Sequence, residues 1–152
     1  MSTLPETIQD EPAPSKAALA LAALAVLLAL ALAVHGPIAQ WPTYHDFADR
    51  RSGFGIPNAA DVLSNLPFAI VGIWGLTATS LSAGWRLFAF ALLATAAGSA
   101  FYHWAPGNGA LVFDRLPIAW ACAALLCSYL AERVDPRWAR PAVLGTALLA
   151  AS

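Results

Sequence analysis

The sequence predicts an all-α, polytopic transmembrane helical bundle, and two features of its composition support this fold class. Of its 152 residues, 59% are hydrophobic and 11% are charged, whereas a typical soluble domain carries about 25% charged residues. The charged residues also leave long gaps, at 17–45, 62–85, 87–113 and 116–131. Because a helix rises about 1.5 Å per residue, roughly 20 apolar residues cross a hydrocarbon core of about 30 Å. The gaps therefore have the size of membrane spans.

Four complete spans are expected within these gaps, at 17–34, 62–81, 86–105 and 111–131. A further hydrophobic stretch begins at Trp138, contains Pro141 and reaches Ser152, where the sequence stops before a fifth span is complete. We therefore expect a truncated bundle of four complete spans plus part of a fifth.

The first 16 residues are polar, with three acidic residues and one lysine, and we expect them to form a disordered cytoplasmic tail. A cleaved signal peptide is the alternative interpretation of 17–34, but a signal peptide has a positive n-region and an apolar run of about 7 to 15 residues. A retained first helix is therefore favoured.

The distribution of basic residues sets the expected orientation, because cytoplasmic loops carry an excess of Lys and Arg. One side of the membrane would hold Lys16, Arg86, Arg133, Arg137 and Arg140, and the other Arg50, Arg51 and Arg115. This places the N-terminus in the cytoplasm and residues 35–61 outside, as an interfacial loop rich in aromatic residues. The chain is then a multi-pass integral membrane protein whose first partner is the lipid bilayer.

Two classes of function and site are excluded by charge and cysteine content. Eight basic residues nearly balance nine acidic ones, which leaves no electrostatic footprint for binding nucleic acid. Cys122 and Cys127 lie five residues apart in an apolar run, so neither a disulfide framework nor a cysteine zinc site is indicated.

Three polar residues near the outer face form the candidate site. Ser99 and His103 are four residues apart and share one helix face, and Asp114 follows the turn at 106–109. We expect His103 and Asp114 to lie at the same depth on adjacent helices, with all three side chains directed into the bundle. A carboxylate at the centre of a span costs about 2.5 to 3.5 kcal/mol, so such residues normally face a polar interior.

These residue types suit a metal-bound histidine whose neighbours position water or substrate. A serine-hydrolase triad is the competing use of the same trio. No nucleophile-elbow pattern surrounds Ser99, so the metal site is favoured.

Residues 98–120, GSAFYHWAPGNGALVFDRLPIAW, resemble the signature of the alkaline ceramidase family: Gly-Ser-x-x-Phe-His, a turn, then Leu-Asp-Glu-Leu-Pro-Met-x-Trp. Tyr102 replaces the usual Phe and Arg115 the usual Glu; the matching residues are Ser99, His103, Asp114, Leu116, Pro117 and Trp120. A second block, DVLSNLPF at 61–68, is similar to the family's Trp-Asn-Thr-x-Ser-Asn segment. The resemblance covers about 44–131, so 17–34 is an added helix and 62–152 a partial ceramidase-like core.

The resemblance implies a seven-helix, zinc-dependent membrane hydrolase that cleaves the amide bond of ceramide or a related lipid. His103 corresponds to one zinc ligand, and Ser99 and Asp114 to residues near the metal. The other two ligands come from a His-x-x-x-His motif on the family's last helix, which this sequence does not contain. The resemblance thus implies a fragment that is inactive alone, with activity in the complete protein. Zinc would polarise the carbonyl and activate water, with Asp114 as proton acceptor and Ser99 as stabiliser of developing charge.

The resemblance also implies a second metal, Ca²⁺, bound by an acidic loop before the first common helix. The candidate ligands are Asp46, Asp49, Asn58 and Asp61, and Arg51 stands where an Asn ligand is expected. Oxygen ligands suit such a hard cation. A solvated interfacial loop with Asp49 paired to an arginine is the other interpretation.

A different class of function stays open, because the same superfamily includes progestin- and adiponectin-type receptors. The alternative is a non-catalytic lipid-binding or receptor-like membrane protein. In either case the expected small-molecule partner is a membrane lipid.

Overall fold

The computed structural model describes residues 16–36, 38–140, 143, 145 and 147, and these residues form helices joined by turns and loops. The only β-pairing among the described residues is an isolated bridge between Gly53 and Ile56. The chain divides into two units, Met1–Pro37 and Ile38–Ser152. The all-α class predicted from the sequence is confirmed for the described residues.

The described residues of the first unit form one helix, α1, at Lys16–His35. The helix covers residues 17–34, and its crossing of the membrane stays a prediction. Apart from Lys16, the expected disordered tail lies outside the described residues. So does most of the hydrophobic stretch expected to begin a fifth span.

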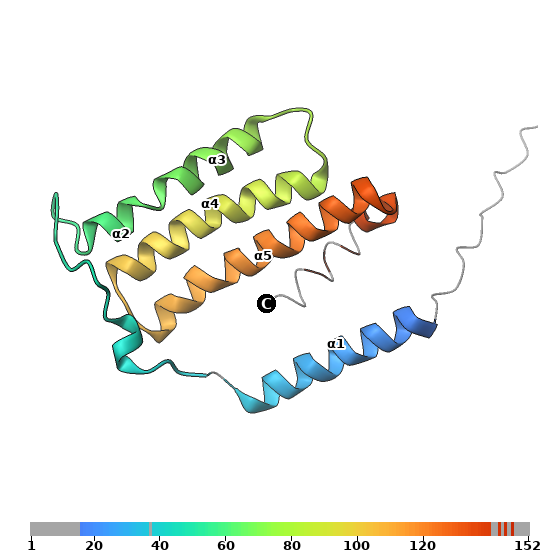
Figure 1. The fold of residues 1–152 in the computed structure, drawn as a ribbon, viewed down its shortest axis with the longest axis horizontal. Helices are drawn as coiled ribbons and strands as arrows, with labels where there is room; N and C mark the ends of the chain where they lie inside the picture. The colour runs from blue at the N-terminus through green and yellow to red at the C-terminus, as the bar shows by residue number, and fades with distance from the viewer. Residues whose placement is uncertain (1–15, 37, 141–142, 144, 146, 148–152) are drawn as a thin grey trace, which may run out of the picture. The chain divides into compact units, whose positions relative to one another are not determined.

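The second unit contains three helical segments that are long and apolar enough to cross a membrane: Ala59–Thr77, Ala83–Trp104 and Asn108–Arg133. The first consists of α2, Ala59–Leu63, and α3, Leu66–Thr77; the others are α4 and α5. Figure 1 shows α4 between α3 and α5, and α4 contacts both. A short 3₁₀ helix, η2, follows at Pro136–Ala139.

Side chains satisfy the backbone where α2 gives way to α3. The Asn65 amide nitrogen donates to the carbonyl oxygens of Asp61 at 3.0 Å and Val62 at 3.4 Å. The Ser64 hydroxyl also donates to the Asp61 oxygen, at 2.7 Å. These side-chain bonds replace backbone hydrogen bonds that the helix loses at the break. Inside a membrane such replacement is needed, because no water is present to satisfy the backbone groups.

Small residues allow the three helices to approach closely. Gly72 of α3 lies so near α4 that an added Cβ would be 2.8 Å from the Leu93 nitrogen and 2.9 Å from the Ala89 oxygen. At Gly98 of α4, a Cβ would overlap the carbonyl oxygen of Phe113 on α5. Such contacts are typical of helix packing in membranes, where small residues bring backbones together.

Pro117 lies inside α5 and affects this second contact. Proline has no N–H, so the carbonyl four residues earlier, that of Phe113, loses its usual intrahelical donor. The same carbonyl oxygen faces Gly98. The sequence thus places the glycine of one helix opposite the backbone carbonyl of the next that lacks its usual i+4 donor.

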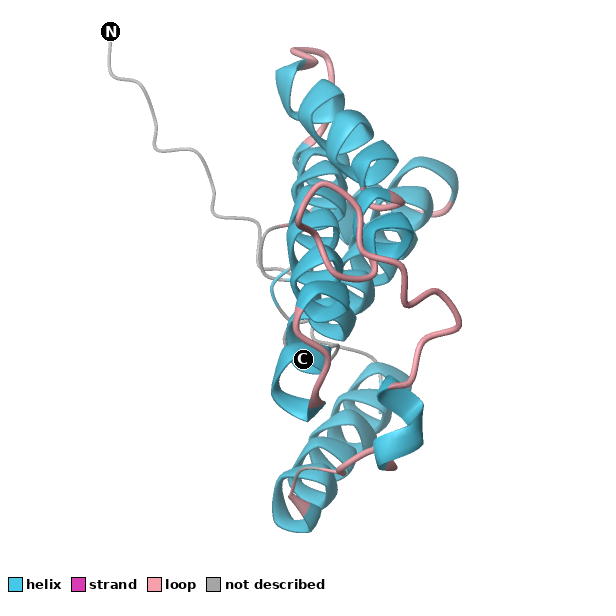
Figure 2. Cartoon of the chain, turned by 90° about the vertical axis from the view of Figure 1, so that its left-hand side faces the viewer, coloured by secondary structure: helices cyan, strands magenta, loops and turns pink. Residues whose placement is uncertain are grey.

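The loop before α2 packs over one end of α4 and α5, the end expected to be the outer one. It includes a 3₁₀ helix, η1, at Pro42–His45. His45 Nδ1 lies 2.9 Å from the Tyr102 hydroxyl, and the Gln40 backbone N–H donates to Asn108 Oδ1 at 2.9 Å. Figure 2 is viewed from this end of the helices. The expected interfacial loop is therefore also a cap on the helix ends.

Candidate functional site

The close contacts fix which residues lie at the same level along the three helices. Gly98 is opposite Phe113, and Gly84 is opposite Ser128, so the antiparallel register of α4 and α5 is consistent along their length. Continuing this register toward the outer end places Asp114 level with Gly98 and His103 level with Gly109. The Gly72 contact gives the register of α3 on α4 in the same way, and it places Asn65 level with Ser99.

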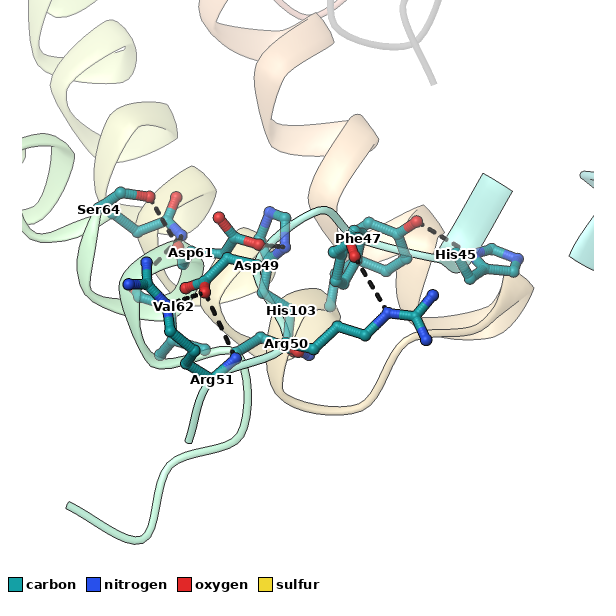
Figure 3. Close-up of polar contacts among 12 residues, drawn as sticks. His45, Phe47, Asp49, Arg50, Arg51, Asp61, Val62, Ser64 and His103 are labelled. Atoms are coloured by element: carbon teal, nitrogen blue, oxygen red, sulfur yellow. Dashed lines mark hydrogen bonds and ion pairs between the residues drawn. The ribbon is translucent and has the colours of Figure 1, made fainter. Parts of the chain in front are cut away.

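The outer of the two polar levels is centred on His103, near the end of α4. Its Nδ1 lies 3.9 Å from Asp61 Oδ2 and has no hydrogen bond to a described residue. Its backbone oxygen accepts from Asn58 Nδ2 at 2.7 Å, and its ring is 4.5 Å from that of Phe47, centroid to centroid. Figure 3 shows Asp61 and His103 directed toward one another. The Asp61 carboxylate thus lies near the imidazole but beyond hydrogen-bond distance.

Asp49 lies in the same cluster (Figure 3) and is paired with Arg51. Arg51 Nε donates to Asp49 Oδ1 at 2.6 Å, and this hydrogen bond holds the pKa of the carboxyl below its ordinary value. The same contact raises the pKa of Arg51. The second oxygen, Oδ2, is buried and has no hydrogen bond to any described residue. The pairing of Asp49 with an arginine, one of the two interpretations from the sequence, is therefore present.

The four expected calcium ligands each have another partner. Asp46 forms an ion pair with Arg50, Asp49 with Arg51 and Asp61 with His103, while Asn58 donates to the His103 carbonyl. The described part of the chain contains no group of three or more His, Cys, Asp or Glu residues that could hold a metal ion. Asp46 and Asp49 are thus engaged by arginines, and calcium binding by these loop residues stays a prediction.

The inner of the two polar levels consists of three buried residues: one from the break between α2 and α3, one from α4 and one from α5. Asn65, Ser99 and Asp114 are 6%, 8% and 7% exposed. Asp114 Oδ2 lies 3.3 Å from Arg115 Nε, and the largely exposed Arg115 also donates to the Tyr44 hydroxyl at 2.5 Å. Arg115 thus partly offsets a carboxylate that is buried in an apolar layer.

The structure differs from the expected geometry in the depth of His103. Five residues separate it from Gly98, and hence from the Asp114 level, which corresponds to roughly 7.5 Å along a helix. The reason is that α5 begins at Asn108, within the expected turn at 106–109, so the centre of the hairpin moves toward α4. The residue that faces His103 is Asp61, which the sequence assigned to calcium, and Ser99 is the residue level with Asp114.

Asn65 was not among the residues singled out from the sequence as site candidates. A signal was present, because a polar amide in an apolar span is costly unless it is satisfied. Its role became visible only with the helix break and its 6% exposure.

The residues present supply one donor toward the expected zinc. His103 is the residue that could act as a ligand, since its Nδ1 forms no hydrogen bond to a described residue and the Asp61 carboxylate lies 3.9 Å away. Catalytic zinc normally has three protein ligands, and the described residues do not gather three. A serine triad has less support, because no hydrogen bond joins Ser99 to His103 among the described contacts.

Comparison of the chain with family models, with curated proteins and with solved structures finds no match.

Proposed function

We propose that the protein is a membrane hydrolase of the alkaline ceramidase type, zinc-dependent, that cleaves the amide bond of ceramide or a related lipid. The observation that supports this best is the pair of buried residues Ser99 and Asp114, level with one another in a layer of apolar helices. His103 lies little more than one helical turn further out, with Asp61 behind it. The proposed reaction, amide hydrolysis, comes from the resemblance of residues 98–120 to the ceramidase signature.

The side chains suggest a division of labour in amide hydrolysis. Asp114 accepts a proton from the attacking water, because its carboxylate is buried beside the reacting group. The Ser99 hydroxyl donates to the oxygen that becomes negative as the carbonyl is attacked. His103 would serve as one zinc ligand, with the Asp61 carboxylate 3.9 Å from its Nδ1. Zinc, when bound, supplies Lewis-acid polarisation and a more acidic water.

The test is hydrolysis by the purified gene product that carries this sequence, measured as fatty acid released from ceramide, with bound zinc measured by mass spectrometry. Asp114→Asn should lower kcat by about 10² to 10⁴-fold, the contribution typical of a general base. Asp135→Asn, at the other end of α5, is the matched control and should leave kcat unchanged. Full activity of Asp114→Asn would eliminate Asp114 as the base, and ceramide binding without turnover or zinc would favour the receptor-like alternative.

We also propose that the N-terminus faces the cytoplasm, on the strength of the Lys and Arg distribution. Single cysteines at positions 52 and 135, with Cys122 and Cys127 changed to Ala, test this in intact cells. An impermeant thiol reagent should label position 52. Labelling of position 135 alone would reverse the proposed topology.

A further inference from the structure

The side-chain amide of the buried residue Asn65 has a nitrogen that forms hydrogen bonds within the fold and an oxygen that does not. Its nitrogen donates to the carbonyls of Asp61 and Val62 at the break between α2 and α3. Its oxygen, Oδ1, accepts no hydrogen bond from a described residue, although the residue is only 6% exposed. The oxygen atom itself is not among the fully buried unpaired atoms of the described residues, so it stays accessible, and in an apolar layer such an acceptor is costly to leave without a donor.

The level of Asn65 gives this oxygen a place in the site. The register of α3 on α4 puts Asn65 at the level of Ser99, and the register of α4 on α5 puts Asp114 at the same level. One level therefore carries an acceptor from α3, a hydroxyl donor from α4 and a carboxylate from α5. All three residues are less than a tenth exposed.

A secondary amide needs this pair of complementary groups. It presents an N–H donor and a C=O acceptor on opposite edges of one plane, and inside a bilayer neither can be satisfied by water. A hydroxyl such as that of Ser99 suits the carbonyl oxygen, and an amide oxygen suits the N–H. Two such contacts from different helices would fix the orientation of the amide plane.

We propose that Asn65 Oδ1 accepts the N–H of the scissile amide and so makes the site selective for lipid amides over lipid esters. This inference rests on the proposed function, because it assigns a substrate contact within the same site. The Asn65 nitrogen keeps its helix-capping bonds, which hold the oxygen in position.

The test compares a short-chain ceramide with an ester analogue in which oxygen replaces the scissile N–H. Asn65→Ala should lower kcat/KM for the amide about tenfold to a hundredfold more than for the ester, since a site built around a hydrogen bond loses discrimination when the partner is removed. Ser64→Ala is the matched control, because Ser64 donates to the same Asp61 carbonyl but adds no acceptor at the site. It should affect both substrates alike. Equal losses for amide and ester in Asn65→Ala would show a purely structural role and overturn the inference.

A binding measurement separates failure of this inference from failure of the proposed function. Affinities of the ceramide and of its N-methyl derivative are compared in detergent micelles, without turnover. Wild-type protein should bind the N–H lipid about tenfold more tightly, and Asn65→Ala should bind both equally. If the wild type hydrolyses neither substrate but shows this preference, the hydrolase proposal fails and the Asn65 contact stands. If the wild type binds the two lipids equally, the contact is refuted whatever the activity.

Discussion

The two ends of the α3–α4–α5 layer use similar polar residues in different ways. Toward the inner end, the Ser128 hydroxyl donates to the Ala124 carbonyl at 2.8 Å, and near the middle of α4 the Thr95 hydroxyl donates to the Ala91 carbonyl, also at 2.8 Å. Toward the outer end, Ser99 is also buried but has no such bond to a described residue, and His103 Nδ1 and Asp49 Oδ2 are unpaired there. A hydroxyl bonded to its own helix serves the fold, whereas one left unpaired is available to a ligand. The local hydrogen bond, more than the residue type, distinguishes the two ends.

The sharpest test of this contrast removes one serine hydroxyl at each end. Ser99→Ala should lower kcat for ceramide hydrolysis by about 10² to 10³-fold, the loss typical of removing one donor to a developing oxyanion. Ser128→Ala should leave kcat within about twofold, because its hydroxyl bonds to Ala124. Both are measured by fatty acid release from protein of equal thermal stability. Equal effects at the two serines would remove the functional distinction between the ends.

A second comparison concerns the glycines that set the register. Gly98→Ala should lower the free energy of unfolding by about 3 kcal/mol, since its Cβ overlaps backbone at Phe113 and overpacking is costly. In Gly84→Ala, the added Cβ would clash with the side-chain hydroxyl of Ser128 and not with backbone. Its smaller cost should be relieved in the double variant with Ser128→Ala, as measured by denaturation in detergent. Failure of this rescue would contradict the inferred register at the inner end.

The next largest effect is expected for the loop that caps the outer ends of α4 and α5. Tyr102→Phe removes the 2.9 Å bond to His45 but retains the ring contact with Phe47, so it should cost about 1 kcal/mol. Trypsin should then cleave faster at Arg50 and Arg51. Tyr129→Phe, on an exposed position of α5, is the control. Unchanged cleavage would mean that other contacts hold the loop.

The smallest expected effect is the acid response of two ion pairs, Asp49–Arg51 at the outer end and Asp135–Arg137 at the inner end. In each, a hydrogen bond from arginine lowers the pKa of the carboxyl from its ordinary value of 3.8. Because the folded pKa is the lower one, the stabilisation is present above pH 3.8 and is lost as the pH falls through the folded pKa. Arg51→Gln and Arg137→Gln should each raise the pKa of the paired carboxyl toward 3.8 in an NMR titration. A response at only one pair would indicate unequal ion pairs.

Part of the fold could be predicted from the sequence, because the gaps between charges mark apolar helices directly. The predicted first and last residues of the helices were less accurate. Arg86 was expected to begin a span, but α4 begins at Ala83, since an arginine near a helix end can extend its charged group toward the membrane surface. The break at Ser64–Asn65 was also missed, because it depends on side-chain bonds to the backbone.

For the candidate site, the burial of its residues could be predicted more readily than their geometry. Ser99 and Asp114 are buried as expected of residues directed away from lipid. The position of His103 depended on where the α4–α5 turn ends, which is set within a few residues. Its contact with Asp61, 42 positions earlier, depends on the packing of α2 against α4 and is not encoded by local spacing.

Pro117 has a mechanical consequence for α5. A helix that lacks one backbone hydrogen bond bends most easily at that point. Here the missing bond is the one from residue 117 to Phe113, and the Phe113 carbonyl is held against Gly98. Bending therefore pivots about the turn that contains Asp114, so thermal motion displaces Asn108 and the capping loop more than it displaces the carboxylate from Ser99.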